Sequence, residues 1–583
     1  RSCWALLLPR ALLAGRPVEV ESQLAVQLSR HGSDEKRRHQ PTPAFRLRWV
    51  ALSKFLDGWE SLPRMRVCDS WLADGGPCSK RRPLASDATG AAAGRQLSEA
   101  LRPASRAVDR GTHCHHCCLC EKREGNAGEW QYEFSTGHCL QKEELLPHWH
   151  KLHRRAEGTV NREQIQQSLI EEMSEMDIID THEHLPSESE RLRQQVDFAT
   201  LFSHYCKADL VSAGMSEQDY LRFTSPGLSP AEKWELFSPY YPHIASGSYC
   251  RAAHLAMERF YGVSHLAGPD DAEALSQQVQ AANQPGLYRR VLKEACRIVT
   301  SMNFGDMNVD REFFTPVLFA THYTEISIVA ELEAVAGETG APITSLSRYV
   351  EGLSAHLARQ QKEGLRGIKF HYAYMRPLRF EPVDTGTAER LFGRISDESR
   401  GWRPHVLGYE EARPLQDYLV HRLVEIAGDL DLVVVFHTGL QADNYNDPEH
   451  TRPTPLWNLF RRYPQTRFNL LHGGIPFVDE AGLLAKYFPN VTLDMAWMHV
   501  ISPELSLRAL RAWLDLVPRS KILGFGGDYC VVEKVYGHLV LARENIATVL
   551  AERVATGAMT RAQASAWARA LLCDNPREVY RLA

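Results

Sequence analysis

The sequence of 583 residues lacks three features that would place it in a special class of protein. No uninterrupted apolar run approaches the roughly 18 residues of a membrane-spanning helix, so we expect neither a membrane protein nor a membrane partner. There is no basic excess, because 67 Lys and Arg residues stand against 72 Asp and Glu residues, and a nucleic-acid partner is therefore not expected. The 13 Cys residues are odd in number and thinly spread, which argues against a disulfide framework and favours the reducing cytoplasm.

Charge is distributed unevenly along the chain. Residues 1–110 contain 19 Lys and Arg against 11 Asp and Glu, in a background rich in Ala, Ser and Pro, whereas the part after residue 150 is acidic. Segments such as residues 85–106 have too few large apolar side chains to offset the conformational entropy lost on folding. The sequence therefore predicts a low-order, basic extension over residues 1–160, with no assigned function.

Two features of this extension leave alternatives open. The first 18 residues contain Arg, Leu and Ala but no acid, as mitochondrial presequences do, so a mitochondrial location stands beside the cytoplasmic one. Near residue 115 a Cys-x-x-Cys spacing suits zinc, but the second half of the cluster matches no standard zinc finger. A small structural zinc site and unliganded thiols both stay open for this cluster, which comprises His113, Cys114, His115, His116, Cys117, Cys118, Cys120, His138 and Cys139.

From residue 176 onward, short runs rich in β-branched residues alternate with stretches of helical period, which is typical of repeated βα units. Helices are clearest at residues 457–463, 478–488 and 505–516. The pattern predicts an α/β fold, a (β/α)8 TIM barrel over residues 170–583, with its site at the carboxyl ends of the strands. A helical insertion of about residues 185–295 is expected to cap the mouth of the barrel. The eight expected strands are residues 177–184, 297–303, 315–322, 367–372, 432–437, 467–472, 491–495 and 521–525.

Ionisable residues stand at the ends of four expected strands. His182 and His184 share a face of the first strand, because side chains alternate along a strand, and two imidazoles about 7 Å apart can converge on one cation. His437, His472 and Asp528 are each the first ionisable residue after an apolar strand. Since the strand ends of a barrel surround one pocket, the sequence predicts a metal site there.

This pattern resembles the amidohydrolase superfamily, whose barrels have His-x-His on strand one, His on strands five and six, and Asp on strand eight. The similarity covers about residues 170–583. The elements G-I-K-F-H (367–371) and L-L-H-G-G (470–474) are closest to the amidohydrolase-related branch of hydrolases and non-oxidative decarboxylases. The long insertion and the segment L-L-C-D-N-P-R-E-V-Y (571–580) resemble uronate isomerases more loosely.

The resemblance implies roles for the residues that match it. One divalent cation, with zinc as the expected metal, would be held by His182, His184, His437 and Asp528. Asp528 would also act as general base, and His472 would polarise the substrate carbonyl or protonate the leaving group. Lys369 and His371 on strand four are expected to bind substrate, Lys369 by anchoring a carboxylate. Two alternatives stay open for Lys369: a carbamylated bridge between two metals, or a packed stem with its ammonium group at the rim.

Two carboxylates are expected to support this site. Asp180 would support His182 or tie down the floor of the barrel, and Asp494 would orient a ligand histidine or cap the segment after its strand. Two alternatives stay open for His204 and Tyr205 in the insertion: side chains that line the mouth of the barrel, or a solvated helix face.

Taken together, the residues and the resemblance predict a metal-dependent hydrolase that acts on a small carboxylated substrate through a metal-activated water. One alternative is a uronate isomerase-like or non-oxidative decarboxylase activity on the same metal site. Another is a non-catalytic barrel that works as a binding protein. The expected partner is a small-molecule substrate, and assembly into a homo-oligomer is left open.

Overall fold

The computed structural model describes residues 120–124, 130–134, 161–305, 307–396 and 406–583. The chain divides into two units, residues 1–14 with 156–583 and residues 15–155. The presequence-like first 18 residues and the Cys/His cluster near residue 115, except Cys120, lie outside the described residues. Within the described part, no helix is long and apolar enough to cross a membrane.

The unit of residues 15–155 contains one described element, an antiparallel pair of strands. These are β1 (Cys120–Glu124) and β2 (Trp130–Phe134). This strand pair lies within the extension that is predicted to have low order from its composition. Aromatic and polar residues alternate along Trp130–Phe134, which is a local strand signal.

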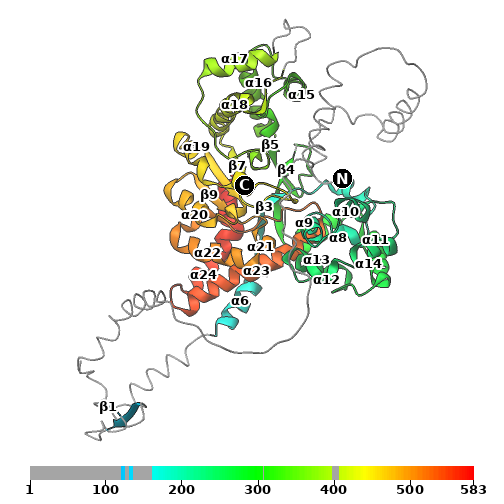
Figure 1. Cartoon of the computed structure of the whole chain (residues 1–583), viewed down its shortest axis with the longest axis vertical. Helices are drawn as coiled ribbons and strands as arrows, with labels where there is room; N and C mark the ends of the chain where they lie inside the picture. Colours follow the sequence, from blue (N-terminus) through cyan, green and yellow to red (C-terminus); the bar gives the residue numbers. More distant parts are fainter. Residues whose placement is uncertain (1–119, 125–129, 135–160, 306, 397–405) are drawn as a thin grey trace, which may run out of the picture. The chain divides into compact units, whose positions relative to one another are not determined.

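Eight parallel strands form one sheet in the order of the sequence, which confirms the predicted barrel (Figure 1). Each lies within two or three residues of its predicted position. The strands are β3 (Ile178–Glu183), β4 (Ile298–Gly305), β5 (Phe314–Phe319), β6 (Gly367–Phe370), β7 (Val433–His437), β8 (Arg467–Leu471), β9 (Val491–Asp494) and β10 (Ile522–Leu523).

The segment after β10 closes the barrel onto β3. Thr181 N donates to Phe525 O at 3.0 Å, Asp528 N donates to His182 O at 2.7 Å, and His184 N donates to Tyr529 O at 3.2 Å. The chain can approach this closely because Gly526 has no side chain, and a Cβ there would lie 3.0 Å from His182 N. The first and last strand regions of the barrel therefore meet in a hydrogen-bonded seam.

Alternation along the strands separates two apolar clusters. Ile368, Phe370, Val434 and Phe436 belong to the large core formed with the surrounding helices. Val433 and Val435, with residues from β3, β4 and β5, form a smaller cluster inside the barrel. Lys369 and His437 lie on this inner face, because they alternate with the outward residues of β6 and β7.

Helices cover the outside of the barrel (Figure 1). The predicted helices of the second half are confirmed as α19, α20 and α22. Apart from short 3-10 turns, the described helices outside the insertion are α6 (Arg162–Ser174), α15 (Val329–Thr339), α16 (Leu346–Lys362), α17 (Thr385–Ser396), α18 (Tyr409–Asp429), α19 (Trp457–Arg462), α20 (Val478–Tyr487), α21 (Met498–Ile501), α22 (Pro503–Leu516), α23 (Val532–Ala555), α24 (Arg561–Arg569), η11 (Ala570–Asp574) and α25 (Asn575–Val579).

One βα unit departs from the expected pattern. β4 and β5 are parallel neighbours, yet only residues 306–313 connect them, and no helix lies among the described residues of that connection. This crossover is shorter than the dozen or so residues usual between parallel strands.

The chain between β3 and β4 is helical (Figure 1, teal to green). Aromatic rings pack at its centre, with Phe223 stacked on Phe237 at 5.1 Å between ring centroids. We call this segment the cap. Its helices are α7 (Glu188–Leu192), α8 (Phe198–Leu201), α9 (Cys206–Ser212), α10 (Glu217–Thr224), α11 (Pro230–Phe237), α12 (Tyr241–Ile244), α13 (Ser248–Tyr261), α14 (Pro269–Ala282) and η3 (Arg289–Ala295).

Candidate metal site

The His-x-His pair lies at the carboxyl end of β3, at the barrel seam. The rings of His182 and His184 are 4.8 Å apart and nearly perpendicular. Phe304 packs edge-on against His182 at 4.0 Å, and Phe319 stacks on His184 at 5.6 Å, so phenyl rings fix both imidazoles. His182 is fully buried and the His184 side chain is 22% exposed, so one imidazole lies inside the barrel and the other at its mouth.

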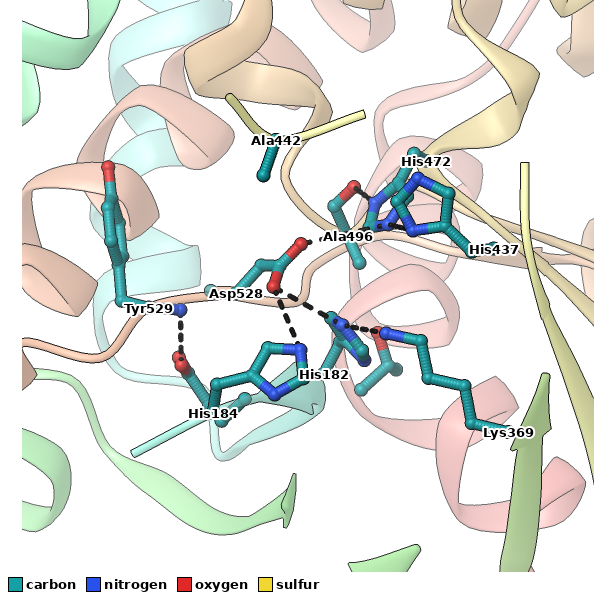
Figure 2. A network of polar contacts seen from close by, with 12 residues as sticks. His182, His184, Lys369, His437, Ala442, His472, Ala496, Asp528 and Tyr529 are labelled. Carbon is teal, nitrogen blue, oxygen red and sulfur yellow. Dashed lines mark hydrogen bonds and ion pairs between the residues drawn. The ribbon is translucent and has the colours of Figure 1, made fainter. Parts of the chain in front are cut away.

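Asp528 faces these two histidines from across the seam (Figure 2). Its Oδ1 lies 3.3 Å from Nε2 of His182 and 3.5 Å from Nε2 of His184. The backbone at Asp528 has a φ of 59°, a left-handed conformation that residues other than glycine rarely adopt. The three side chains place ligand atoms within 4.8 Å of one another and form a candidate metal site.

The protonation of these groups suits a cation. Burial lowers the pKa of His182 to about 3 and holds the pKa of His184 well below its usual value. Burial acts to raise the pKa of Asp528, but the adjacent imidazoles of His182, His472 and His184 outweigh it and leave that pKa well below its usual value. Near neutral pH the trio therefore offers two neutral imidazoles and one carboxylate, which are the forms that bind a divalent cation.

His437, at the end of β7, and His472, after β8, lie beside this trio. His472 Nδ1 is 3.0 Å from Ala496 O, and His437 Nε2 is 3.0 Å from Leu440 O, so each ring places its N–H on a carbonyl. The two remaining nitrogens, His472 Nε2 and His437 Nδ1, face each other at 3.1 Å, and His472 Nε2 is also 3.7 Å from Asp528 Oδ2.

In this contact between the two rings, two unprotonated nitrogens face each other with their lone pairs. Burial lowers the pKa of His472 to about 4 and holds that of His437 well below its usual value, so neither ring supplies a second proton near neutral pH. A cation among them would stabilise two unprotonated nitrogens that face each other beside a carboxylate. The donor set therefore fits a bound metal, although His437 lies outside the closest trio of His182, His184 and Asp528.

Lys369 reaches into this site from β6, whereas His371 is held at its edge. Lys369 Nζ lies 3.0 Å from His182 Nε2, and the ammonium group also lies 5.0 Å from the centroid of the Phe304 ring. Burial lowers the pKa of Lys369 to about 8. His371 Nδ1 lies 3.0 Å from Thr321 Oγ1, and the His371 ring packs edge-on against Phe319.

Asp180 and Asp494 contact backbone and polar side chains rather than imidazole rings. Asp180 accepts hydrogen bonds from Ser301 Oγ at 2.9 Å and from the amides of His182 and Gly527 at 3.1 and 3.0 Å. It thereby joins the end of β3 to the residue before Asp528. Burial raises its pKa to about 6.

Asp494 performs a similar task between β3, β8 and β9. Its Oδ1 accepts from Thr181 Oγ1 at 2.8 Å and from the amide of Ala496 at 2.9 Å, and its Oδ2 accepts from Asn469 Nδ2 at 2.6 Å. Burial raises the pKa of Asp494 to about 7. Because Ala496 O in turn accepts from His472, Asp494 acts on that ring through the backbone.

Sequence reasoning overlooked Glu183, the residue between the two histidines. Its side chain is fully buried, and Oε2 accepts a hydrogen bond from the amide of Tyr529 at 2.7 Å. Burial and the neighbouring Asp180 hold the pKa of Glu183 well above its usual value. Asp180 and Glu183 thus accept hydrogen bonds from the backbone amides of the two residues that flank Asp528.

The cap supplies a wall of the site. His204 and Tyr205 pack against Tyr529 and Trp497, so of the two alternatives left open for them the solvated helix face is wrong. The Tyr205 ring is 5% exposed and stacks on Trp497 at 4.1 Å, and Trp497 packs edge-on against His472 at 5.3 Å. Burial holds the pKa of Tyr205 well above its usual value, and the Asp528 carboxylate raises it further. Nε1 of Trp497 and Nδ1 of His204 are buried without a hydrogen-bond partner in the described part of the chain.

Comparison with known proteins agrees with this geometry. The family profile described as Amidohydrolase matches residues 243–582, which is more than half of the chain. The chain belongs to the amidohydrolase family. The matched range includes Lys369, His437, His472 and Asp528 and begins after the His-x-His pair.

One curated relative and two solved structures are similar to this chain. Protein fluG of Emericella nidulans is 29% identical over 225 residues, which are 37% of this chain and 25% of that protein, so the match spans a quarter of the relative's length. Uronate isomerase of Thermotoga maritima aligns with a TM-score of 0.59 and 14% identity over 72% of this chain and 97% of that one. Glucuronate isomerase of Caulobacter crescentus aligns with a TM-score of 0.59 and 18% identity over 73% and 95%. At these identities the two structures establish a shared fold.

Proposed function

We propose that this amidohydrolase-family chain is a metal-dependent hydrolase of a small carboxylated substrate. In this proposal one divalent cation, zinc in the first instance, is held by His182, His184, His437 and Asp528. The observation that supports it best is the pair of unprotonated nitrogens on His437 and His472 that face each other beside a carboxylate. Neutral imidazole and carboxylate are the ligands that zinc prefers.

A divalent cation bound there would polarise a substrate carbonyl and lower the pKa of a water molecule. The protein side chains then move the protons. The ionised Asp528 carboxylate accepts a proton as general base. His472, whose Nδ1–H is held by Ala496 O, presents its unprotonated Nε2 to the site, 3.7 Å from Asp528 Oδ2. It would take the proton that Asp528 has accepted and pass it to the leaving group.

Lys369 and residues of the cap would bind and orient the proposed substrate. The buried ammonium of Lys369 lies 3.0 Å from His182 Nε2 and would pair with a substrate carboxylate. His371 would line the same side of the pocket. The stacked rings of Tyr205 and Trp497 form an apolar wall beside His472, and Trp497 Nε1 would donate a hydrogen bond to a substrate oxygen.

Metal analysis of ligand variants tests this proposal. His182→Ala and His184→Ala should each lower the metal content per chain, measured by inductively coupled plasma mass spectrometry, and should abolish turnover. His243→Ala, an exposed histidine of α12, is the matched control and should retain both. Unchanged metal content in both ligand variants would refute the site.

A second candidate is isomerisation of a uronic acid on the same metal. It is favoured by the alignment of this chain with almost the whole length of two uronate isomerase structures, and by an aromatic wall over the strand ends. Incubating the metal-loaded protein with uronates, aromatic acids and carboxylated amides separates the reactions by product: ketose, carbon dioxide or a hydrolysed bond. Absence of turnover on all three would instead favour a binding protein.

A further inference from the structure

A second pocket lies at the end of the barrel opposite the candidate metal site. Its volume is about 330 Å³, and it lies where the strands begin, since Ile179 of β3 and Phe314 of β5 form part of its wall. Leu582 adds a further apolar side chain. A volume of this size suits a small ligand.

Three arginines from separate segments line this pocket: Arg311, Arg366 and Arg577. Arg311 lies in the short connection between β4 and β5, Arg366 directly precedes β6, and Arg577 lies in α25. The wall contains no Asp or Glu side chain.

The three guanidinium groups have few partners within the described residues. Arg366 Nη1 is 3.4 Å from Leu365 O, and Arg577 donates to the backbone oxygen of Ala583. None of the three forms an ion pair with an Asp or Glu side chain in that part of the chain, whereas Arg348 and many other surface arginines do. The wall of the pocket therefore carries three positive side chains and no acidic side chain.

Arg311 packs against the segment that carries Arg366. Its Nη1 lies 3.1 Å from where a Cβ on Gly364 would be, so the guanidinium packs directly over that glycine. Burial lowers the pKa of Arg311, the nearby Glu363 acts in the opposite direction, and the charge of Arg366 lowers it again. Two guanidinium groups that repel each other gain from an anion placed between them.

We propose that this pocket binds a small molecule through a multivalent oxyanion group, either a phosphate or a polycarboxylate. Guanidinium groups form paired hydrogen bonds with such oxygens, and three of them around one pocket suit an anion with several oxygens. The apolar wall of Ile179, Phe314 and Leu582 would contact the carbon skeleton of the ligand. This site is separate from the metal chemistry and stands whether or not the proposed hydrolase activity does.

Calorimetric titration of the full chain tests the proposal. The probes are inorganic phosphate and tricarballylate, each at constant ionic strength set with sodium chloride, so that general screening by salt is equal throughout. At least one probe should bind. Arg311→Met and Arg366→Met should each weaken binding about tenfold, which corresponds to about 1.4 kcal/mol, and the double variant should weaken it further.

Two controls make the outcome decisive. Arg508→Met changes an exposed arginine of α22 and should leave affinity unchanged. Thermal unfolding of each variant checks that the fold is retained, and Arg311→Lys provides a second variant that keeps the charge but loses the paired geometry. Binding of phosphate alone or of tricarballylate alone identifies the oxyanion. Absence of binding by both, or equal affinity in wild type and the double variant as expected for an anion held at the metal site, overturns the proposal.

Discussion

Replacing Gly527 with alanine should disturb the candidate metal site through one steric contact. Gly527 precedes Asp528, and a Cβ there would fall on Oε1 of Glu183, 2.9 Å from its Cδ and 3.4 Å from Cγ1 of Val535. Carbon atoms in contact normally lie about 3.5–4.0 Å apart, so Glu183 or the loop must move by roughly 1 Å. Glu183 has little freedom to move, because it is fully buried and bonded to the amide of Tyr529.

The expected cost has two parts. Overpacking of this kind lowers the free energy of unfolding by about 1–3 kcal/mol. Displacement of Asp528 should weaken metal binding by about 10- to 100-fold, as removal of a supporting contact typically does. Chemical denaturation measures the first effect, and competition with a chromophoric chelator measures the second. Gly393→Ala in helix α17 is the matched control, because no atom lies within 4 Å of its Cβ position and the change should be neutral or stabilising.

A double-mutant cycle with Glu183→Ala decides whether the contact is the cause. Glu183→Ala alone should destabilise by about 1–3 kcal/mol, since the amide of Tyr529 loses its acceptor. In that background the space is open, and Gly527→Ala should cost at least about 1 kcal/mol less than in the wild type. An equal cost in both backgrounds would refute the steric reasoning.

Three other predictions concern pH, a buried ion pair and metal removal. Burial lowers the pKa of His499 to about 4, below its unfolded value of 6.5, so the unfolded chain binds more protons between these values. The free energy of unfolding should therefore fall below pH 6.5 by up to about 1.4 kcal/mol per pH unit. In urea denaturation, the difference in free energy of unfolding between the wild type and His499→Gln should shrink by the same amount, and a difference that stays constant with pH contradicts this. Arg191 and Glu533 form a fully buried ion pair at 2.9 Å. Arg191→Met should therefore lower the free energy of unfolding by about 3–5 kcal/mol, because it leaves a buried charge without a partner, and the double variant Arg191→Met, Glu533→Gln should lower it clearly less. A larger loss in the double variant would contradict this. A chelator should lower the unfolding temperature of the wild type but not of His182→Ala, because loss of a ligand bound at about 100 times its Kd costs about 2.7 kcal/mol.

The barrel could be predicted because its strands follow local rules. Apolar runs such as Val433–His437 end in an ionisable residue, and alternation places Lys369 and His437 on the inner face. Strand order in a parallel barrel then follows the order of the sequence. The convergence of His182, His184 and Asp528 was predictable for the same reason, since each lies at a carboxyl end.

Contacts between distant segments could not be predicted in this way. Glu183 appears in the sequence only as a spacer between two histidines, and its partner Tyr529 is 346 positions away. Tyr205 enters the site because the cap folds back onto Trp497, which no local periodicity reveals. The arginines of the second pocket come from three segments joined only by tertiary structure.

The hydrogen-bonded seam between β3 and the segment after β10 has a consequence for how the chain assembles. Its contacts, such as the hydrogen bond from Asp528 N to His182 O, join residues that are among the most distant in sequence within the barrel. On a folding pathway that pairs neighbouring strands first, these contacts form last, because closing the longest loop costs the most conformational entropy. The metal ligands lie on both sides of this junction. A bound ion would therefore hold the two sides of the seam together and slow the first step of unfolding. Metal uptake would then indicate that the barrel has closed.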